Sequence, residues 1–234
     1  MITCRTAEQC GQADFGWLQA RYTFSFGHYF DPTLLGYASL RVLNQEVLAP
    51  GAAFQPRTYP QVDILNLILQ GEAEYRDSLG NHVHAKTGDA LLFSPQQGVS
   101  YSEHNLSANK SLTRIQLWLN ACPERESAPT QHQRLSTRPV QLLASPAGEQ
   151  GSLQLRQQMW IHHLALAAGE QQKMPLHGHR AYLQSIHGTV DATGPQTGTS
   201  QRLTCGDGAF VEEEQHLVIK AITPLRALLI DLPV

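Results

Sequence analysis

One layout of strand-like segments and glycines occurs twice in this chain. In residues 42–119, three glycines are spaced 20 and then 17 positions apart, and in residues 159–232 the two corresponding intervals are 19 and 18. The third glycine opens GDALLF in the first segment and GDGAFV in the second. The six glycines are Gly51, Gly71, Gly88, Gly169, Gly188 and Gly206. Such a repeat predicts two similar modules in tandem.

The sequence pattern of each module predicts β-strands. Apolar runs of four to eight residues, such as LNLIL, ALLF, HLVIKA and ALLID, are bounded by Gly, Asn, Asp and Ser, and few segments show helical periodicity. EAEYRDSLGNHVHA predicts a hairpin that turns around residues 78–81. We therefore predict an all-β fold with few short helices: two cupin barrels, that is, double-stranded β-helices or jelly rolls, in tandem. The predicted boundaries are residues 1–120 for an N-terminal cupin with its extension, 121–150 for a polar linker, and 151–234 for a C-terminal cupin.

Charge and hydropathy exclude several partners. The formal net charge is −3 and there is no basic run, whereas phosphate binding needs clustered Lys and Arg, so we expect no nucleic-acid partner. The first residues lack the apolar core of a signal peptide, and no stretch approaches the ~20 apolar residues of a membrane span. We expect a cytoplasmic protein with no membrane partner, and a monomer.

Several motifs resemble the pirin family, whose members are bicupins. They are TFSFGHYFDP at 23–32, GEAEYRDSLGN at 71–81 and GDALLFSPQQGVSYSE at 88–103. The resemblance covers residues 15–120 well and the second module more loosely, and it is greatest to one enterobacterial subgroup. It implies one iron-like metal held by three His and one Glu in the first cupin, and in some members quercetin 2,3-dioxygenase activity.

The implied metal site is altered in this chain. Arg57 and Tyr59 stand at the first two His positions, Tyr101 stands at the third, and only Glu103 is kept. Arginine stays protonated and has no lone pair to give a metal. We therefore expect no metal cofactor here, and we hypothesise that Arg57 replaces the metal charge by a bidentate pair with Glu103.

Three other interpretations of these positions remain open. Arg57 and Tyr59 could be ordinary barrel-rim residues that bind nothing. The barrel could hold a small anion or another small molecule. The two tyrosines could also hold iron or another divalent transition metal as phenolates, through an altered ligand set.

The histidines offer one alternative metal site. His177 and His179 form a His-x-His in the second module, and His216 is the candidate third ligand. Two such rings on a strand would point to one face, as a metal needs. In the pirin family, however, the second cupin is not the one that carries metal.

The four cysteines raise a redox hypothesis. Cys122 precedes Pro123, in a stretch that predicts the first turn of a helix, which would lower the pKa of its thiol. Cys10 lies in a polar stretch where we expect exposure, whereas we expect Cys205 to be buried. The candidate redox thiols are therefore Cys122 and Cys10, against the simpler interpretation of incidental thiols.

The sequence thus favours a pirin-like bicupin with a degenerate metal site and no catalytic residue. Its expected role is stress or redox response, or small-ligand binding. The alternative is a metal-dependent oxygenase similar to quercetin 2,3-dioxygenase.

Overall fold

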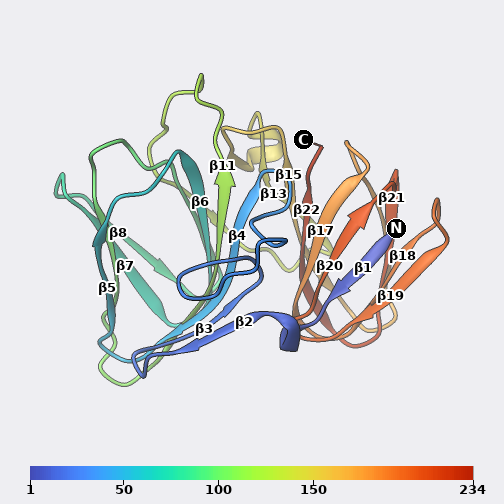
Figure 1. Cartoon of the computed structure of the whole chain (residues 1–234), viewed down its shortest axis with the longest axis horizontal. Helices are drawn as coiled ribbons and strands as arrows, with labels where there is room; N and C mark the ends of the chain where they lie inside the picture. Colours follow the sequence, from blue (N-terminus) through green and yellow to red (C-terminus); the bar gives the residue numbers. More distant parts are fainter. Residues whose placement is uncertain (234) are drawn as a thin grey trace. The chain divides into compact units, whose positions relative to one another are not determined.

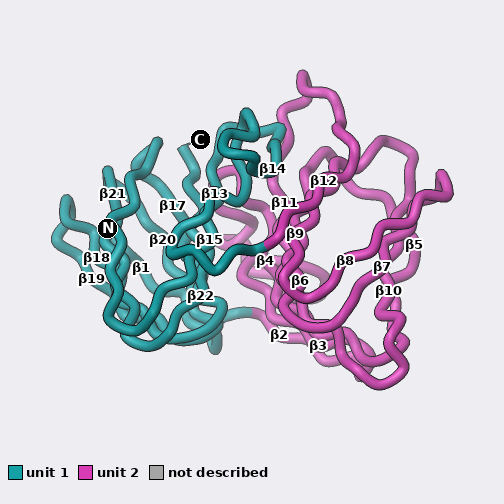
Figure 2. The backbone as a smooth tube through the Cα atoms, turned by 180° about the vertical axis from the view of Figure 1, so that it is seen from behind, with its two compact units in different colours: residues 1–10, 135–234 teal, residues 11–134 magenta. Residues whose placement is uncertain are grey.

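The computed structural model describes residues 1–233 and divides them into two compact units. The N-terminal unit comprises residues 11–134, and the C-terminal unit comprises residues 135–234 together with residues 1–10 (Figure 2). Within the described residues the structure has 22 strands and two short 3₁₀ helices (Figure 1). The predicted all-β class is confirmed. No helix of residues 1–233 is long and apolar enough to cross a membrane.

The N-terminal unit consists of two antiparallel sheets. The larger has the order β12-β9-β6-β11-β4-β3-β2, and the smaller has the order β5-β10-β7-β8. The strands are β2 (Gly11–Asp14), β3 (Leu18–Tyr22), β4 (Leu40–Leu48), β5 (Ala53–Arg57), β6 (Val62–Gln70), β7 (Glu72–Asp77), β8 (His82–Lys86), β9 (Asp89–Phe93), β10 (Tyr101–Asn105), β11 (Leu112–Asn120) and β12 (Gln131–Arg134). Apolar side chains of both sheets share one core cluster.

The C-terminal unit repeats this plan. Its larger sheet has the order β1-β20-β17-β22-β15-β13-β14, and its smaller sheet has the order β16-β21-β18-β19. The elements are β1 (Ile2–Arg5), η1 (Ala7–Gln9), β13 (Val140–Ser145), η2 (Glu149–Gly151), β14 (Leu153–Gln154), β15 (Trp160–Leu166), β16 (Gln171–Pro175), β17 (Arg180–His187), β18 (Val190–Gly194), β19 (Thr199–Leu203), β20 (Gly208–Glu212), β21 (His216–Ala221) and β22 (Leu225–Asp231). A second core cluster fills this unit.

The predicted hairpin is confirmed. Strands β7 and β8 pair antiparallel, and the turn between them is held by Asp77, whose Oδ1 accepts hydrogen bonds from the backbone N–H of Leu79 and Asn81 at 2.9 Å each. Gly80 has φ 89°, the left-handed conformation that glycine adopts without strain.

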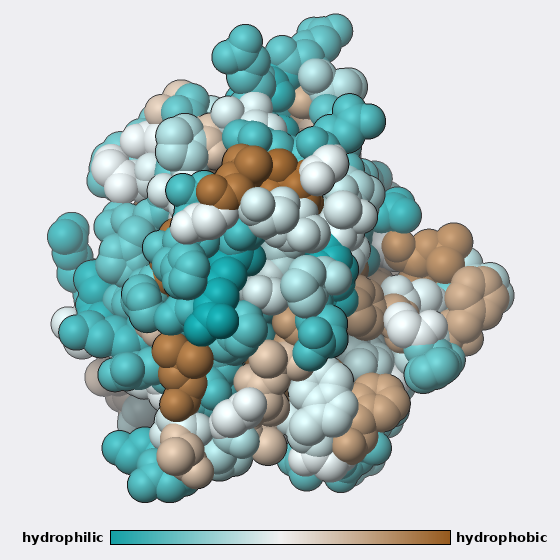
Figure 3. All heavy atoms as spheres, turned by 90° about the vertical axis from the view of Figure 1, so that its left-hand side faces the viewer, coloured by the Kyte–Doolittle hydropathy of each residue, from teal (hydrophilic) through white to brown (hydrophobic). Residues whose placement is uncertain are grey.

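On the face seen in Figure 3, most exposed atoms belong to hydrophilic residues, and the hydrophobic side chains lie in small separate groups.

The predicted domain boundaries need correction at both ends of the N-terminal cupin. Residues 2–5 form β1, which pairs with β20 of the C-terminal unit, so the chain begins in the second module. The segment 121–150 is not a linker throughout. Its residues 131–134 form β12 beside β9, and its residues 140–145 form β13 beside β15. Polar composition concealed these strands because both lie near the edge of their sheets.

Candidate functional site

The interior of the N-terminal unit is lined by polar side chains from three neighbouring strands. In the register of β11 with β4, Arg114 lies opposite Glu46 and Gln116 lies opposite Asn44. On its other side, Gln116 lies opposite Asn66 of β6. Because side chains two residues apart share a face of a strand, these residues line one face of the sheet. All five side chains are buried.

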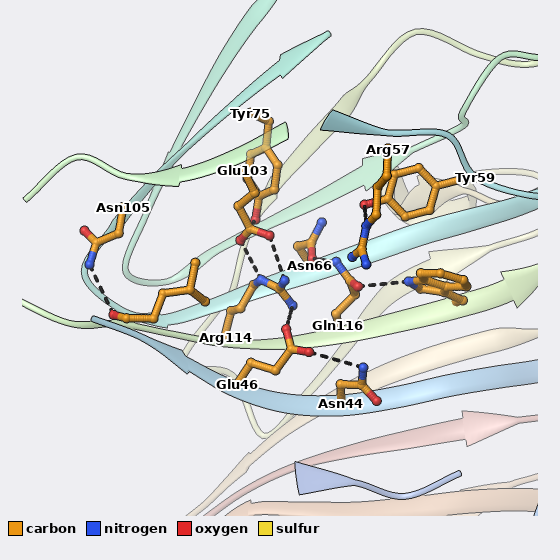
Figure 4. A network of polar contacts seen from close by, with 12 residues as sticks. Asn44, Glu46, Arg57, Tyr59, Asn66, Tyr75, Glu103, Asn105, Arg114 and Gln116 are labelled. Carbon is orange, nitrogen blue, oxygen red and sulfur yellow. Dashed lines mark hydrogen bonds and ion pairs between the residues drawn. The ribbon is translucent and has the colours of Figure 1, made fainter. Parts of the chain in front are cut away.

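Arg114 is the centre of this group (Figure 4). Its Nε lies 2.5 Å from Glu103 Oε1 and its Nη2 lies 2.7 Å from Glu103 Oε2, a bidentate pair. Its Nη1 forms an ion pair with Glu46 Oε2 at 2.7 Å. Tyr75 donates its hydroxyl to Glu103 Oε1 at 3.0 Å, and Asn44 donates Nδ2 to Glu46 Oε1 at 3.2 Å. The guanidinium thus holds two buried carboxylates.

Burial and charge together set the protonation of this network. Burial alone would lower the pKa of Arg114, but the charges of Glu103 and Glu46 outweigh it and raise that pKa. Burial raises the pKa of Glu46, an effect that Arg114 partly opposes. The pKa of Tyr75 is raised well above its usual value by burial and then by the charge of Glu103. Arg114 is therefore a permanent cation in the barrel interior.

The hypothesis that Arg57 pairs with Glu103 is wrong. Arg57 donates Nε to the hydroxyl of Tyr59 at 3.0 Å, and its guanidinium lies 5.1 Å from the ring centres of both Phe54 and Tyr59. In the pairing of β10 with β5, Tyr101 lies opposite Arg57, and an irregularity after Tyr101 places Glu103 opposite Phe54. Figure 4 shows Arg57 beside Tyr59, while Arg114 holds Glu103.

The four former metal-ligand positions nevertheless come together around one cavity. Tyr59, Tyr101 and Glu103 line it, and Arg57 contacts Tyr59 at its edge. The rings of Tyr59 and Tyr101 lie 6.0 Å apart, edge to face. The remaining wall is Ile64, Asn66, Tyr75, Phe93, Pro95, Ser102 and Gln116. The cavity measures about 320 Å³ out to its open mouth.

The chain's relatives agree with this architecture. The family model described as Pirin matches residues 3–119, and the model described as Quercetinase C-terminal cupin domain matches residues 142–232. Pirin-like protein YhaK of Escherichia coli K12 is 69% identical over 234 residues, with all of both chains covered.

The chain belongs to the pirin family.

The predicted tandem cupin fold and the similarity to one enterobacterial subgroup, that of YhaK, are confirmed by the same matches. Two further relatives bear on the site. Quercetin 2,3-dioxygenase of Escherichia coli K12 is 33% identical over 237 residues, covering 100% of this chain and 99% of the relative. The crystal structure of the bacterial pirin YhhW from Escherichia coli in complex with nickel(II) superposes with a TM-score of 0.90 at 31% identity, covering 100% and 99% of the two chains.

The residues of this pirin do not fit the metal that the family implies. Both oxygens of Glu103 are bonded to Arg114, so the one retained ligand already has a cation partner. The hydroxyl of Tyr59 accepts a hydrogen bond from Arg57, and that of Tyr101 accepts one from the backbone N–H of Gln96 at 3.2 Å. A divalent ion placed here would face two guanidiniums and no imidazole. Residues 1–233 contain no group of three or more His, Cys, Asp and Glu that could hold a metal.

The histidines of the second module serve other contacts. His177 Nδ1 lies 2.7 Å from Oδ2 of the buried Asp231, and its ring stacks on Trp160 with 3.7 Å between the ring centres. His179 lies in the bend before β17 with φ 63°, and His216 begins β21. These three histidines form no group that could hold a metal within the part of the chain described.

The surroundings of all three thiols differ from expectation. Cys10 is buried, with its Sγ 3.5 Å from the carbonyl oxygen of Thr6, and Cys205 is exposed. Cys122 is partly exposed, but residues 123–125 form a turn and bend instead of the expected helix. Pro123 is compatible with a turn as well as with a helix start, which explains the wrong prediction.

Sequence reasoning missed Arg114, the residue that matters most here. The signal was present in LTRIQLWL, where Arg114 and Gln116 alternate with Ile115 and Leu117. An alternating strand normally turns such polar residues to solvent. Here that face is the barrel interior, and the only local hint was the matching alternation of Asn44 and Glu46 in VLNQEVL.

Proposed function

We propose that this pirin is a non-catalytic, small-ligand-binding bicupin whose N-terminal metal site is degenerate. The observation that carries the proposal is the bidentate bond of Arg114 to both oxygens of Glu103. A buried carboxylate needs a compensating charge, and a guanidinium supplies it without a metal. The cavity beside this pair keeps aromatic walls and a few polar groups, which is the usual make-up of a small-molecule site.

The alternative is a metal-dependent oxygenase similar to quercetin 2,3-dioxygenase, supported by the 33% identical relative of that name. Oxygen uptake with quercetin, recorded after addition of nickel, iron or copper salts, separates the two. The Escherichia coli quercetin 2,3-dioxygenase serves as the positive control under the same conditions. We expect turnover by the control and none by this chain. Metal-stimulated oxygen uptake that Glu103→Gln abolishes would refute the proposal.

A redox-responsive role is a second candidate, and Cys122 supports it. Its side chain is partly exposed directly after β11, whereas the other candidate, Cys10, is buried. A thiol must be accessible to react with a small oxidant. Oxidation at Cys122 would place a polar group next to the strand that carries Arg114.

A further inference from the structure

A chain of three side chains fixes the direction of the hydrogen bonds at the back of the cavity. Trp118 donates Nε1 to Gln116 Oε1 at 2.9 Å, and Gln116 donates Nε2 to Asn66 Oδ1 at 2.9 Å. An indole N–H can only donate. It therefore sets the orientation of the Gln116 amide, which in turn sets that of Asn66.

Asn66 ends this chain with an unused donor. Its oxygen is occupied by Gln116, and its Nδ2 has no hydrogen-bond partner among the described residues. The side chain is 1% exposed and lines the cavity. A water or a ligand in the cavity can therefore accept the hydrogen bond that Nδ2 offers. The Nδ2 group is therefore a donor aimed into the cavity (Figure 4).

Two phenols add donors of the same kind. The oxygen of Tyr59 accepts from Arg57 Nε, and the oxygen of Tyr101 accepts from the backbone N–H of Gln96. Each hydroxyl keeps its own proton, which has no acceptor within the described residues. Three donors with unused protons therefore line the cavity, contributed by β6, by β10 and by the loop after β5.

The side-chain acceptors Glu103 and Gln116, which line the cavity, already hold hydrogen-bond partners. Glu103 accepts from Arg114 and Tyr75, and Gln116 accepts from Trp118. The hydroxyl of Ser102 contacts His104 Nε2 at 2.8 Å. A ligand that only donates hydrogen bonds, such as an ammonium group, would have to share acceptors that already hold a partner.

The formal charges of the barrel interior cancel. Arg114 and Arg57 carry two positive charges, and Glu103 and Glu46 carry two negative ones. Burial raises the pKa of Glu46, and the charges of Arg114 and, more weakly, of Arg57 oppose that rise. An entering group therefore meets oriented donors instead of a net opposing charge. Preorganised donors in a dry site stabilise a negative oxygen far better than water-exposed ones do.

We propose that this cavity binds a small carboxylate, whose oxygens accept hydrogen bonds from Asn66 Nδ2, Tyr59 and Tyr101. The cavity has room for about one water-sized group inside its mouth, which suits the small polar end of a ligand. The carboxylate enters the narrow end, and the body of the ligand lies against the aromatic walls. The inference rests on the proposed metal-free barrel.

The test is an NMR titration of the ¹⁵N-labelled full chain at fixed ionic strength. The Asn66 side-chain NH₂ signal is identified by its loss in Asn66→Asp. Acetate and benzoate are compared with benzamide and benzylammonium. The Asn81 side-chain signal is the internal control, because its Nδ2 donates to Asp77 in the exposed hairpin turn. We expect saturable shifts at Asn66, none at Asn81, and roughly tenfold tighter binding of benzoate than of benzamide, since a charge-assisted bond is about twice as strong as a neutral one.

Tyr101→Phe removes one donor and keeps the ring, and we expect it to weaken benzoate binding roughly tenfold. Three results would overturn the inference: an Asn66 signal that neither carboxylate moves, benzylammonium binding as tight as that of benzoate, or unchanged binding in Tyr101→Phe. If the purified chain instead holds a metal through Glu103, the proposed function itself fails. If the chain is metal-free and the Asn66 signal is unmoved, only the carboxylate assignment fails.

Discussion

Arg114 and Glu103 meet through two parallel hydrogen bonds in the interior of the N-terminal barrel, at 2.5 and 2.7 Å. Arg114 comes from β11 of the larger sheet, and Glu103 comes from β10 of the smaller one. The pair therefore joins the two sheets across the barrel. It also occupies the one ligand position that the chain shares with metal-binding pirins.

The first prediction concerns this pair. Arg114→Met should lower the free energy of unfolding by about 3–5 kcal/mol, because it leaves two buried carboxylates without their cation. Adding Glu103→Gln and Glu46→Gln should restore part of the loss. Denaturant unfolding followed by circular dichroism measures both effects.

The matched control for that experiment is Arg202→Met. Arg202 also forms a bidentate pair, with Asp191 at 2.7 and 2.8 Å, but its side chain is 61% exposed. Exposed pairs contribute little to stability, so the loss should be much smaller than for Arg114. Similar losses in the two variants would contradict the central role of the buried pair.

The second prediction is a pH dependence that arises from His163. This residue is 1% exposed, and neither ring nitrogen has a hydrogen-bond partner among residues 1–233. Burial, followed by the charge of Arg226, lowers its pKa from 6.5 to about 4. Between pH 6.5 and 4, the His163 side chain is protonated in the unfolded chain and neutral in the folded chain. Stability from this group is therefore present above pH 6.5 and is lost as the pH falls.

At pH 5 the loss from His163 should be about 2 kcal/mol relative to pH 7.5. We expect the free energy of unfolding of His163→Leu to change less between these two pH values than that of the parent chain, by about the same 2 kcal/mol. His82→Asn, at an exposed strand position, should keep the dependence of the parent chain. If His163→Leu retained the full pH dependence, another group would have to be its source.

The third prediction concerns the repeated glycines. A Cβ at Gly71 would lie 2.7 Å from the backbone oxygen of Ser111, and one at Gly188 would lie 2.1 Å from that of Pro224. At Gly51 the backbone is also left-handed, with φ 71°, but a Cβ would meet nothing within 4 Å. Gly51→Ala should cost about 1–2 kcal/mol, and Gly71→Ala and Gly188→Ala at least about 1 kcal/mol more. Equal losses of unfolding free energy at all three would show that the close approach is unimportant.

The fourth prediction tests the redox candidate. After mild peroxide treatment and digestion, mass spectrometry of the cysteine-containing peptides should find adducts of one or two oxygens on the Cys122 peptide. It should find none on the peptide of the buried Cys10. Cys205 is the control for exposure alone. Adducts on Cys205 without any on Cys122 would remove the support for a sensing role at Cys122.

The sequence predicted the fold well because the repeat and the period-2 patterns are local. The hairpin of β7 and β8, for example, follows from residues 72–86 alone. The sequence also identified Tyr59, Tyr101 and Glu103 as neighbours. It failed at the partner of Glu103, because that choice depends on the register between β10 and β5 and on a residue from the other sheet. It failed at β1 for the same reason: pairing of residues 2–5 with residues 208–211 leaves no local pattern.

The most direct test of the account is the nickel content of the purified chain after incubation with excess nickel and removal of the unbound ion. Glu103→Gln is measured in parallel, because it removes the one retained ligand while conserving the side-chain shape. We predict that the parent chain and Glu103→Gln hold the same background level of nickel by elemental analysis, since Arg114 already occupies both oxygens of Glu103. One nickel ion per chain, lost in Glu103→Gln, would contradict the claim that a guanidinium stands in place of the metal.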